Sequence, residues 1–100
     1  MEQIFSEIIQ NNKPVLVDFY ADWCAPCRMM KPILEAVKQK MGDDVTIIKV
    51  DVDKNHAAAE TYNVTGIPTL MIFKKGEVKW RQVGIVQANQ LIQQLNNYKN

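Results

Sequence analysis

The sequence has few metal-binding residues and no long apolar run. Its 100 residues include two cysteines and one histidine, His56, so a four-ligand structural zinc site is hard to assemble from them. No apolar stretch approaches the roughly 20 residues that a membrane-spanning helix needs. Neither charge is in large excess, because 12 Lys and Arg residues face 11 Asp and Glu residues, spread along the chain. This balance gives no indication of nucleic acid or an anionic membrane as a partner.

The sequence also lacks repeats, low-complexity tracts and linkers. With 47% hydrophobic residues it is long enough for one compact core, and we expect a single domain over residues 1–100. The first residues, MEQIFSE, are acidic and lack the apolar core of a signal peptide, so we expect a cytoplasmic protein. Lasting structural disulfides are uncommon in the cytoplasm.

The two cysteines, Cys24 and Cys27, lie in the run WCAPCR, just after an apolar stretch at 15–20 that reads as a buried strand. Apolar residues then recur at helical spacing: Met29, Met30, Ile33, Leu34, Val37 and Met41. The cysteines therefore stand at a helix N-terminus, where unpaired N–H groups and a partial positive charge stabilise a thiolate. We expect Cys24 to be the nucleophile.

Cys27 is spaced to close a disulfide with Cys24. Residues three apart on a helix share one face, at a separation that a disulfide tolerates. Pro26 suits the first helical turn, where its missing N–H costs nothing, and it stiffens the small ring. The pattern predicts reversible thiol–disulfide exchange.

Two other interpretations of the cysteine pair stay open at this point. A CxxC pair is half of some zinc sites, although the usual site needs a second pair of Cys or His. A purely structural disulfide is the other interpretation, but so short a loop removes little entropy from the unfolded chain. A chain of this length also builds a core without one.

The chain alternates between strand and helix patterns and then forms a hairpin. We expect helices at 2–11, 26–41, 55–62 and 87–97, and strands at 14–21, 44–51, 69–74 and 77–83. The hairpin turn falls at 74–77, where Gly76 supplies a positive φ angle. A β-α-β unit followed by β-β-α predicts an α/β fold, with a mixed four-stranded sheet and helices on both faces.

The order and spacing of several short segments resemble the thioredoxin family over nearly the whole chain. These segments are Val17–Phe19, Ala21–Arg28, Pro32, Lys49–Asp53, Tyr62–Val64, Gly66–Thr69 with Phe73, and Val83–Gly84. The resemblance implies the thioredoxin fold and the activity of a protein-disulfide reductase. Cys24 would form a mixed disulfide with a substrate, and Cys27 would resolve it.

The sequence departs from the family in a few places. Family members usually begin with an extra strand, and too few residues precede Pro14 to hold both that strand and a helix, so we expect the strand to be missing. Ala25 stands where the family most often has Gly, which we expect to shift the redox potential modestly. Tyr20 replaces a commoner Trp, and Arg28 a commoner Lys.

Asp18 is the most informative residue outside the CxxC motif. In the middle of an apolar strand it would be buried, which raises the pKa of a carboxyl. By resemblance it lies beneath the cysteines and serves as general base for Cys27. The alternative is that strand alternation turns it to a polar surface. Lys49 looks like its partner, or else it is a solvated lysine on an edge strand.

The resemblance also implies a substrate surface around Cys24. Pro68 matches the family's cis-proline, and a substrate backbone would pair with Ile67 as an added strand. Trp23, Val83 and Gly84 would complete a flat apolar rim. The alternative for Trp23 is core packing.

The resemblance implies no bound cofactor, with the Cys24–Cys27 disulfide as the redox centre of a monomer. Electrons would come from NADPH through a flavin-containing thioredoxin reductase and pass to protein substrates with disulfides. An exported thiol–disulfide oxidase or isomerase is the main alternative, and it would carry a signal ahead of this sequence. A redox-silent binding module is the other.

Overall fold

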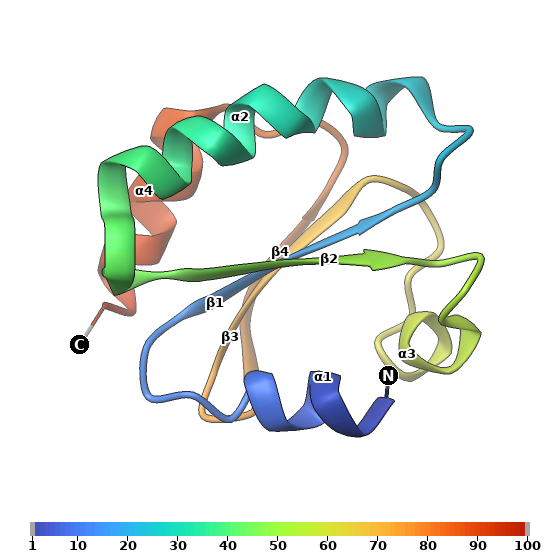
Figure 1. Ribbon diagram of the computed structural model, residues 1–100, viewed down its shortest axis with the longest axis horizontal. Coiled ribbons are helices and arrows are strands. Elements are labelled where there is room, and N and C mark those ends of the chain that lie inside the picture. Colours follow the sequence, from blue (N-terminus) through green and yellow to red (C-terminus); the bar gives the residue numbers. More distant parts are fainter. Residues whose placement is uncertain (1, 100) are drawn as a thin grey trace.

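The computed structural model describes residues 2–99, with side chains from Phe5 onward (Figure 1). Its elements in chain order are α1 (Glu2–Ile8), β1 (Val15–Tyr20), α2 (Ala25–Met41), β2 (Thr46–Asp51), α3 (His56–Thr61), β3 (Thr69–Lys74), β4 (Glu77–Val83) and α4 (Ala88–Asn97). A 3-10 turn, Gly42–Asp44, joins α2 to β2. Every expected helix and strand is confirmed, most within one residue of its expected bounds.

Two boundaries differ from the expected ones for identifiable reasons. The first helix ends at Ile8 rather than residue 11. Backbone carbonyl groups just after it accept hydrogen bonds from the β3–β4 turn instead of continuing the helix. Gly76 N donates to Ile9 O at 2.8 Å, and Lys75 N donates to Asn11 O at 3.0 Å. The strand expected from residue 44 begins at Thr46, because the 3-10 turn occupies its first residues.

The strands form one four-stranded sheet in the order β2-β1-β3-β4. β1 runs parallel to β2 and antiparallel to β3, and β3 and β4 form the expected hairpin. The mixed sheet of the thioredoxin fold is therefore confirmed, and within residues 2–99 no strand lies outside β2. In Figure 1, α2 and α4 cover one face of the sheet, α1 and α3 the other, and no segment crosses in front of β2.

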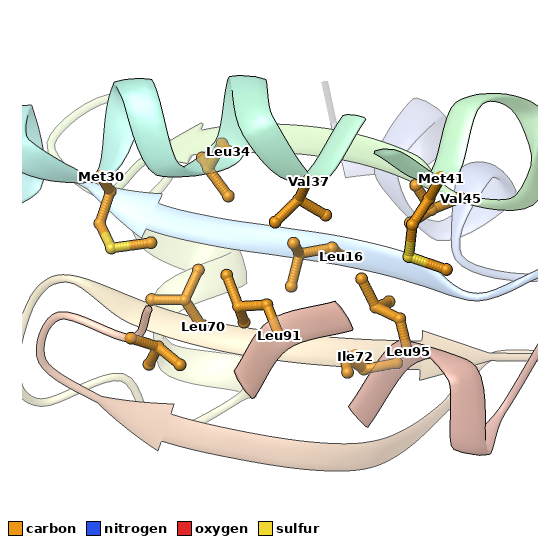
Figure 2. Packing of buried hydrophobic residues seen from close by; sticks show 11 residues of the cluster. Leu16, Met30, Leu34, Val37, Met41, Val45, Leu70, Ile72, Leu91 and Leu95 are labelled. Atoms are coloured by element: carbon orange, nitrogen blue, oxygen red, sulfur yellow. The ribbon is translucent and has the colours of Figure 1, made fainter. Parts of the chain in front are cut away.

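Both faces of the central strand β1 are buried, which accounts for its nearly continuous apolar sequence. Leu16 faces α2 and α4, where it packs with Met30, Leu34 and Leu91 (Figure 2). On the other face the buried cluster comprises Phe5, Ile9, Val15, Val17, Phe19, Val50, Ala58, Met71 and Phe73. Each large side chain buried in this way contributes about 1.5–3 kcal/mol. These two layers fix the N-terminus of α2 above the C-terminal end of β1.

Candidate active site

Cys24 and Cys27 form a disulfide at the N-terminus of α2. Cys24 is the N-cap residue, with extended backbone angles, and Pro26 lies in the first turn. The two Cα atoms are 5.2 Å apart, inside the range that a disulfide requires. Each cysteine is only 4% exposed, so overall exposure does not distinguish the two residues. Ala25, between them, is exposed.

Hydrogen bonding, in contrast, does distinguish the two sulfurs. The backbone N–H of Cys27 donates to Cys24 Sγ at 3.2 Å. Cys24 Sγ also lies 3.9 Å from the carbonyl oxygen of Ile67. No hydrogen bond to Cys27 Sγ occurs among residues 2–99. In the reduced protein the helix N-terminus therefore stabilises a thiolate at Cys24.

This asymmetry predicts selective alkylation of the reduced protein. At pH 7 iodoacetamide should modify Cys24 about tenfold or more faster than Cys27, because a thiol with the usual pKa of about 8.5 is mostly protonated there. Peptide mass spectrometry after timed quenching measures both rates. Equal modification of the two residues would contradict the assignment of Cys24 as nucleophile.

Asp18 is completely buried on the face of β1 that α2 covers, so it does not point to a polar surface. Neither carboxylate oxygen has a hydrogen-bond partner among the described residues. Burial raises the pKa of this carboxyl from 3.8 to about 6, and the Lys49 ammonium lowers it in part. Cys27 projects from the buried side of α2 over the same face. An acid of this kind exchanges a proton near neutral pH.

Lys49 combines the two interpretations that the sequence left open. It lies opposite Asp18 in the parallel β1–β2 register and lowers the pKa of that carboxyl, but it forms no ion pair with it. Its side chain is exposed on an edge strand, with Nζ 4.5 Å from the centre of the Tyr20 ring. Lys49 is thus an electrostatic neighbour of Asp18, and its ammonium group is held in place by the Tyr20 ring. Sequence reasoning missed the Tyr20 contact, although Tyr20 lies two residues after Asp18 and therefore on the same strand face.

An exposed apolar rim borders Cys24. Trp23 is 69% exposed, which shows that the core-packing interpretation is wrong, and Val83 is 56% exposed. The Ile67–Pro68 bond is cis, as predicted. Gly84 has a positive φ of 98°, and its N–H donates to the carbonyl of Pro68 at 2.8 Å. The predicted rim residues are therefore brought together by the ends of β1 and β4 and the segment before β3.

Two further features of this region were not predicted. Trp23 Nε1 donates to Asp53 Oδ2 at 2.8 Å, which fixes the exposed ring. Asp53 lies in a segment that carried the family resemblance, but nothing in the sequence paired it with Trp23. Met29, one of the apolar residues that recur at helical spacing, is exposed. Its neighbour Met30 fills the core position.

Within residues 2–99, no group of three or more His, Cys, Asp or Glu side chains is arranged to hold a metal ion. In the same part of the chain, no helix has both the length and the apolar character needed to cross a membrane.

Comparisons with known proteins agree with this geometry. The family model described as Thioredoxin matches residues 1–97. A thioredoxin-like protein of Synechocystis sp. is 49% identical over 92 residues, which cover 91% of this chain and 88% of that protein. Thioredoxin Y, chloroplastic, of Oryza sativa subsp. japonica is 46% identical over 93% of this chain, which spans only 56% of the rice protein. The structure of a mutant thioredoxin from Halobacterium salinarum superposes with a TM-score of 0.88 at 38% identity, covering 96% of this chain and 83% of that one.

Proposed function

Since this chain belongs to the thioredoxin family, we propose that it works in the cytoplasm as a monomeric reductase of protein disulfides. In this proposal a flavin-containing thioredoxin reductase reduces the Cys24–Cys27 disulfide again with electrons from NADPH. Its activity is that of a thiol–disulfide oxidoreductase. The observation that carries the assignment is the Cys24–Cys27 disulfide at the N-terminus of α2, with a backbone N–H directed at the Cys24 sulfur.

In the first step, the Cys24 thiolate attacks one sulfur of a substrate disulfide. A bond forms between that sulfur and Cys24 Sγ, and the other substrate sulfur leaves as a thiolate that takes up a proton. The Cys27 backbone N–H and the end of α2 stabilise the attacking thiolate. Attack at Cys24 places the substrate backbone beside the carbonyl of Ile67, 3.9 Å from Cys24 Sγ, where it would pair as an added strand.

In the second step, Cys27 loses its proton and attacks Cys24 Sγ, which releases the second substrate thiolate. The enzyme dithiol has then given up two electrons and two protons, and the substrate disulfide has gained them. Asp18 is the general base in this proposal, because it is buried on the face of β1 over which Cys27 projects. Its pKa of about 6 also lies near the operating pH. Lys49 keeps that pKa from rising further.

Substrate binding relies on the apolar rim rather than on a deep pocket. The exposed side chains of Trp23 and Val83 and the half-buried Ile67 provide an apolar surface beside Cys24, and Gly84 leaves room above the backbone. A flat surface of this kind suits protein substrates of varied sequence. The proposed cytoplasmic setting is one in which a dithiol stays reduced, as a reductase requires.

A coupled assay tests the proposed function. With NADPH, a bacterial thioredoxin reductase and a two-chain substrate such as insulin, we expect steady NADPH consumption that depends on the chain and ends when the substrate disulfides are exhausted. The control omits insulin and should consume only enough NADPH to reduce Cys24–Cys27 once. Dithiothreitol-driven insulin reduction without any NADPH-driven turnover would contradict the proposed electron source, and no reduction by either route would contradict the function itself.

A further inference from the structure

A hollow of about 240 Å³ opens beside Cys27, on the side of the site where α2 meets β1 and β2. It is lined by Tyr20, Ala21, Asp22, Cys27, Arg28, Lys31 and Lys49. The lining brings together three cationic side chains and a single carboxylate. The apolar rim, in contrast, borders Cys24. The redox pair therefore lies between an apolar surface and a basic hollow.

The three cations of the hollow are held in position without an ion pair to any described residue, and the Asp18 carboxyl is an electrostatic neighbour of Lys49. Lys49 Nζ lies over the Tyr20 ring, 4.5 Å from its centre. Arg28 Nη1 donates to the backbone carbonyl of Asp22 at 3.0 Å, which orients the guanidinium and leaves its other N–H groups available. Lys31, one helical turn after Cys27, is exposed. Within residues 2–99, none of these three side chains forms an ion pair with a carboxylate.

We propose that this hollow is a subsite for a carboxylate side chain of the substrate, an Asp or Glu close in sequence to the half-cystine that Cys24 attacks. A guanidinium with free N–H groups and two ammonium groups is suited to binding a carboxylate. Because Cys27 lines the hollow and is within disulfide distance of Cys24, a carboxylate in the hollow lies close to the substrate sulfur that Cys24 attacks. The volume accommodates one side chain rather than a second strand.

The inference rests on the proposed function and specifies its substrate class. The carboxylate takes part in no bond exchange, so the electron and proton balance of the two steps is unchanged. The subsite adds attraction for acidic sequences near the disulfide and repulsion for basic ones. The apolar rim thus accepts substrates of varied sequence, and the subsite selects among them by the charge near the disulfide.

The test compares matched peptides that each contain one disulfide and differ at one flanking residue, Glu, Gln or Lys. The reduced protein is mixed with each peptide in a stopped-flow instrument, and the second-order rate constant is measured. At low salt we expect the Glu peptide to react about fivefold faster than the Gln peptide and the Lys peptide to react more slowly than either, a preference that about 0.5 M salt should largely remove.

Two variants of α2 decide whether the hollow itself is responsible. Lys31→Gln should reduce the Glu-to-Gln rate ratio from about five to about two, the scale of one exposed ion pair. Lys40→Gln removes the same charge from an exposed position on α2 outside the hollow and should leave the ratio unchanged. Tyr20→Leu, which frees Lys49, should also lower the ratio, and Tyr20→Phe, which keeps the ring, should restore it.

Equal rates for the Glu and Gln peptides would overturn the subsite, as would an equal loss of preference in the two lysine variants. Reduction of the Gln peptide would in that case still support the disulfide reductase. Failure to reduce any of the three peptides would instead count against the proposed function. The two failures are therefore distinguishable in one set of measurements.

Discussion

Replacing Cys24 with serine should lower the rate of protein-disulfide reduction by at least about three orders of magnitude, the scale on which losing a catalytic nucleophile acts. A serine hydroxyl is protonated at pH 7 and does not attack a disulfide, even with the Cys27 N–H in place. Cys27→Ser should act differently, because it leaves the nucleophile intact. Its first step should run at close to the original rate, and catalytic turnover should cease because nothing resolves the mixed disulfide.

Stopped-flow kinetics with a chromogenic disulfide separates these outcomes, because release of the first substrate thiolate reports on attack by Cys24 alone. Ala36→Ser, on the exposed side of α2, is the matched control for introducing a serine and should behave like the original protein. Substantial multiple turnover by Cys24→Ser would contradict the mechanism. So would normal turnover by Cys27→Ser.

Asp18→Asn should make the protein more stable and its second step slower. The Asp18 carboxyl has a pKa of about 6 in the folded protein, against an ordinary value of 3.8. As the pH rises, the unfolded chain releases this proton first, so the stability of the protein falls between pH 3.8 and about 6 and stays lower above it. Ionising the buried Asp18 carboxyl costs about 3 kcal/mol of folding stability at most. The amide of the variant avoids this cost, but as a buried polar group without a hydrogen-bond partner it has a smaller cost of its own. We therefore expect a gain of about 1–3 kcal/mol at pH 7 that vanishes near pH 4.

The same substitution removes the proposed base for Cys27. Resolution of the mixed disulfide should slow by about a hundredfold at pH 7, at the low end of general-base effects, while attack by Cys24 changes less. Urea melts at several pH values and two-step stopped-flow measurements check the two effects. Asp43→Asn, at an exposed position, is the control and should alter neither. A variant that is less stable and equally fast at pH 7 would contradict the buried-base role.

Much of the fold could be predicted because its signals are local. The apolar run of β1, the helical spacing of α2 and the turn at Gly76 each fix one element from neighbouring residues. The spacing of Cys24 and Cys27 likewise needs only the geometry of one helical turn.

The remaining features depend on contacts between distant segments. The first helix ends early because Ile9 and Asn11 bond to the β3–β4 turn, more than 60 residues away. The basic hollow requires β1, β2 and α2 to meet, and helical spacing alone does not decide which of Met29 and Met30 faces the core. Such choices follow from packing of the whole sheet against its helices.

Cys24 forms the mixed disulfide with the substrate, and Cys27 acts only afterwards. The most direct measurement is to incubate reduced Cys27→Ser with a protein disulfide, digest the product without reductant and identify the linked peptides by mass spectrometry. We expect one substrate cysteine joined to Cys24, in an adduct that persists until a thiol is added. An unmodified Cys24 after full exposure to a substrate that the original protein reduces would contradict it.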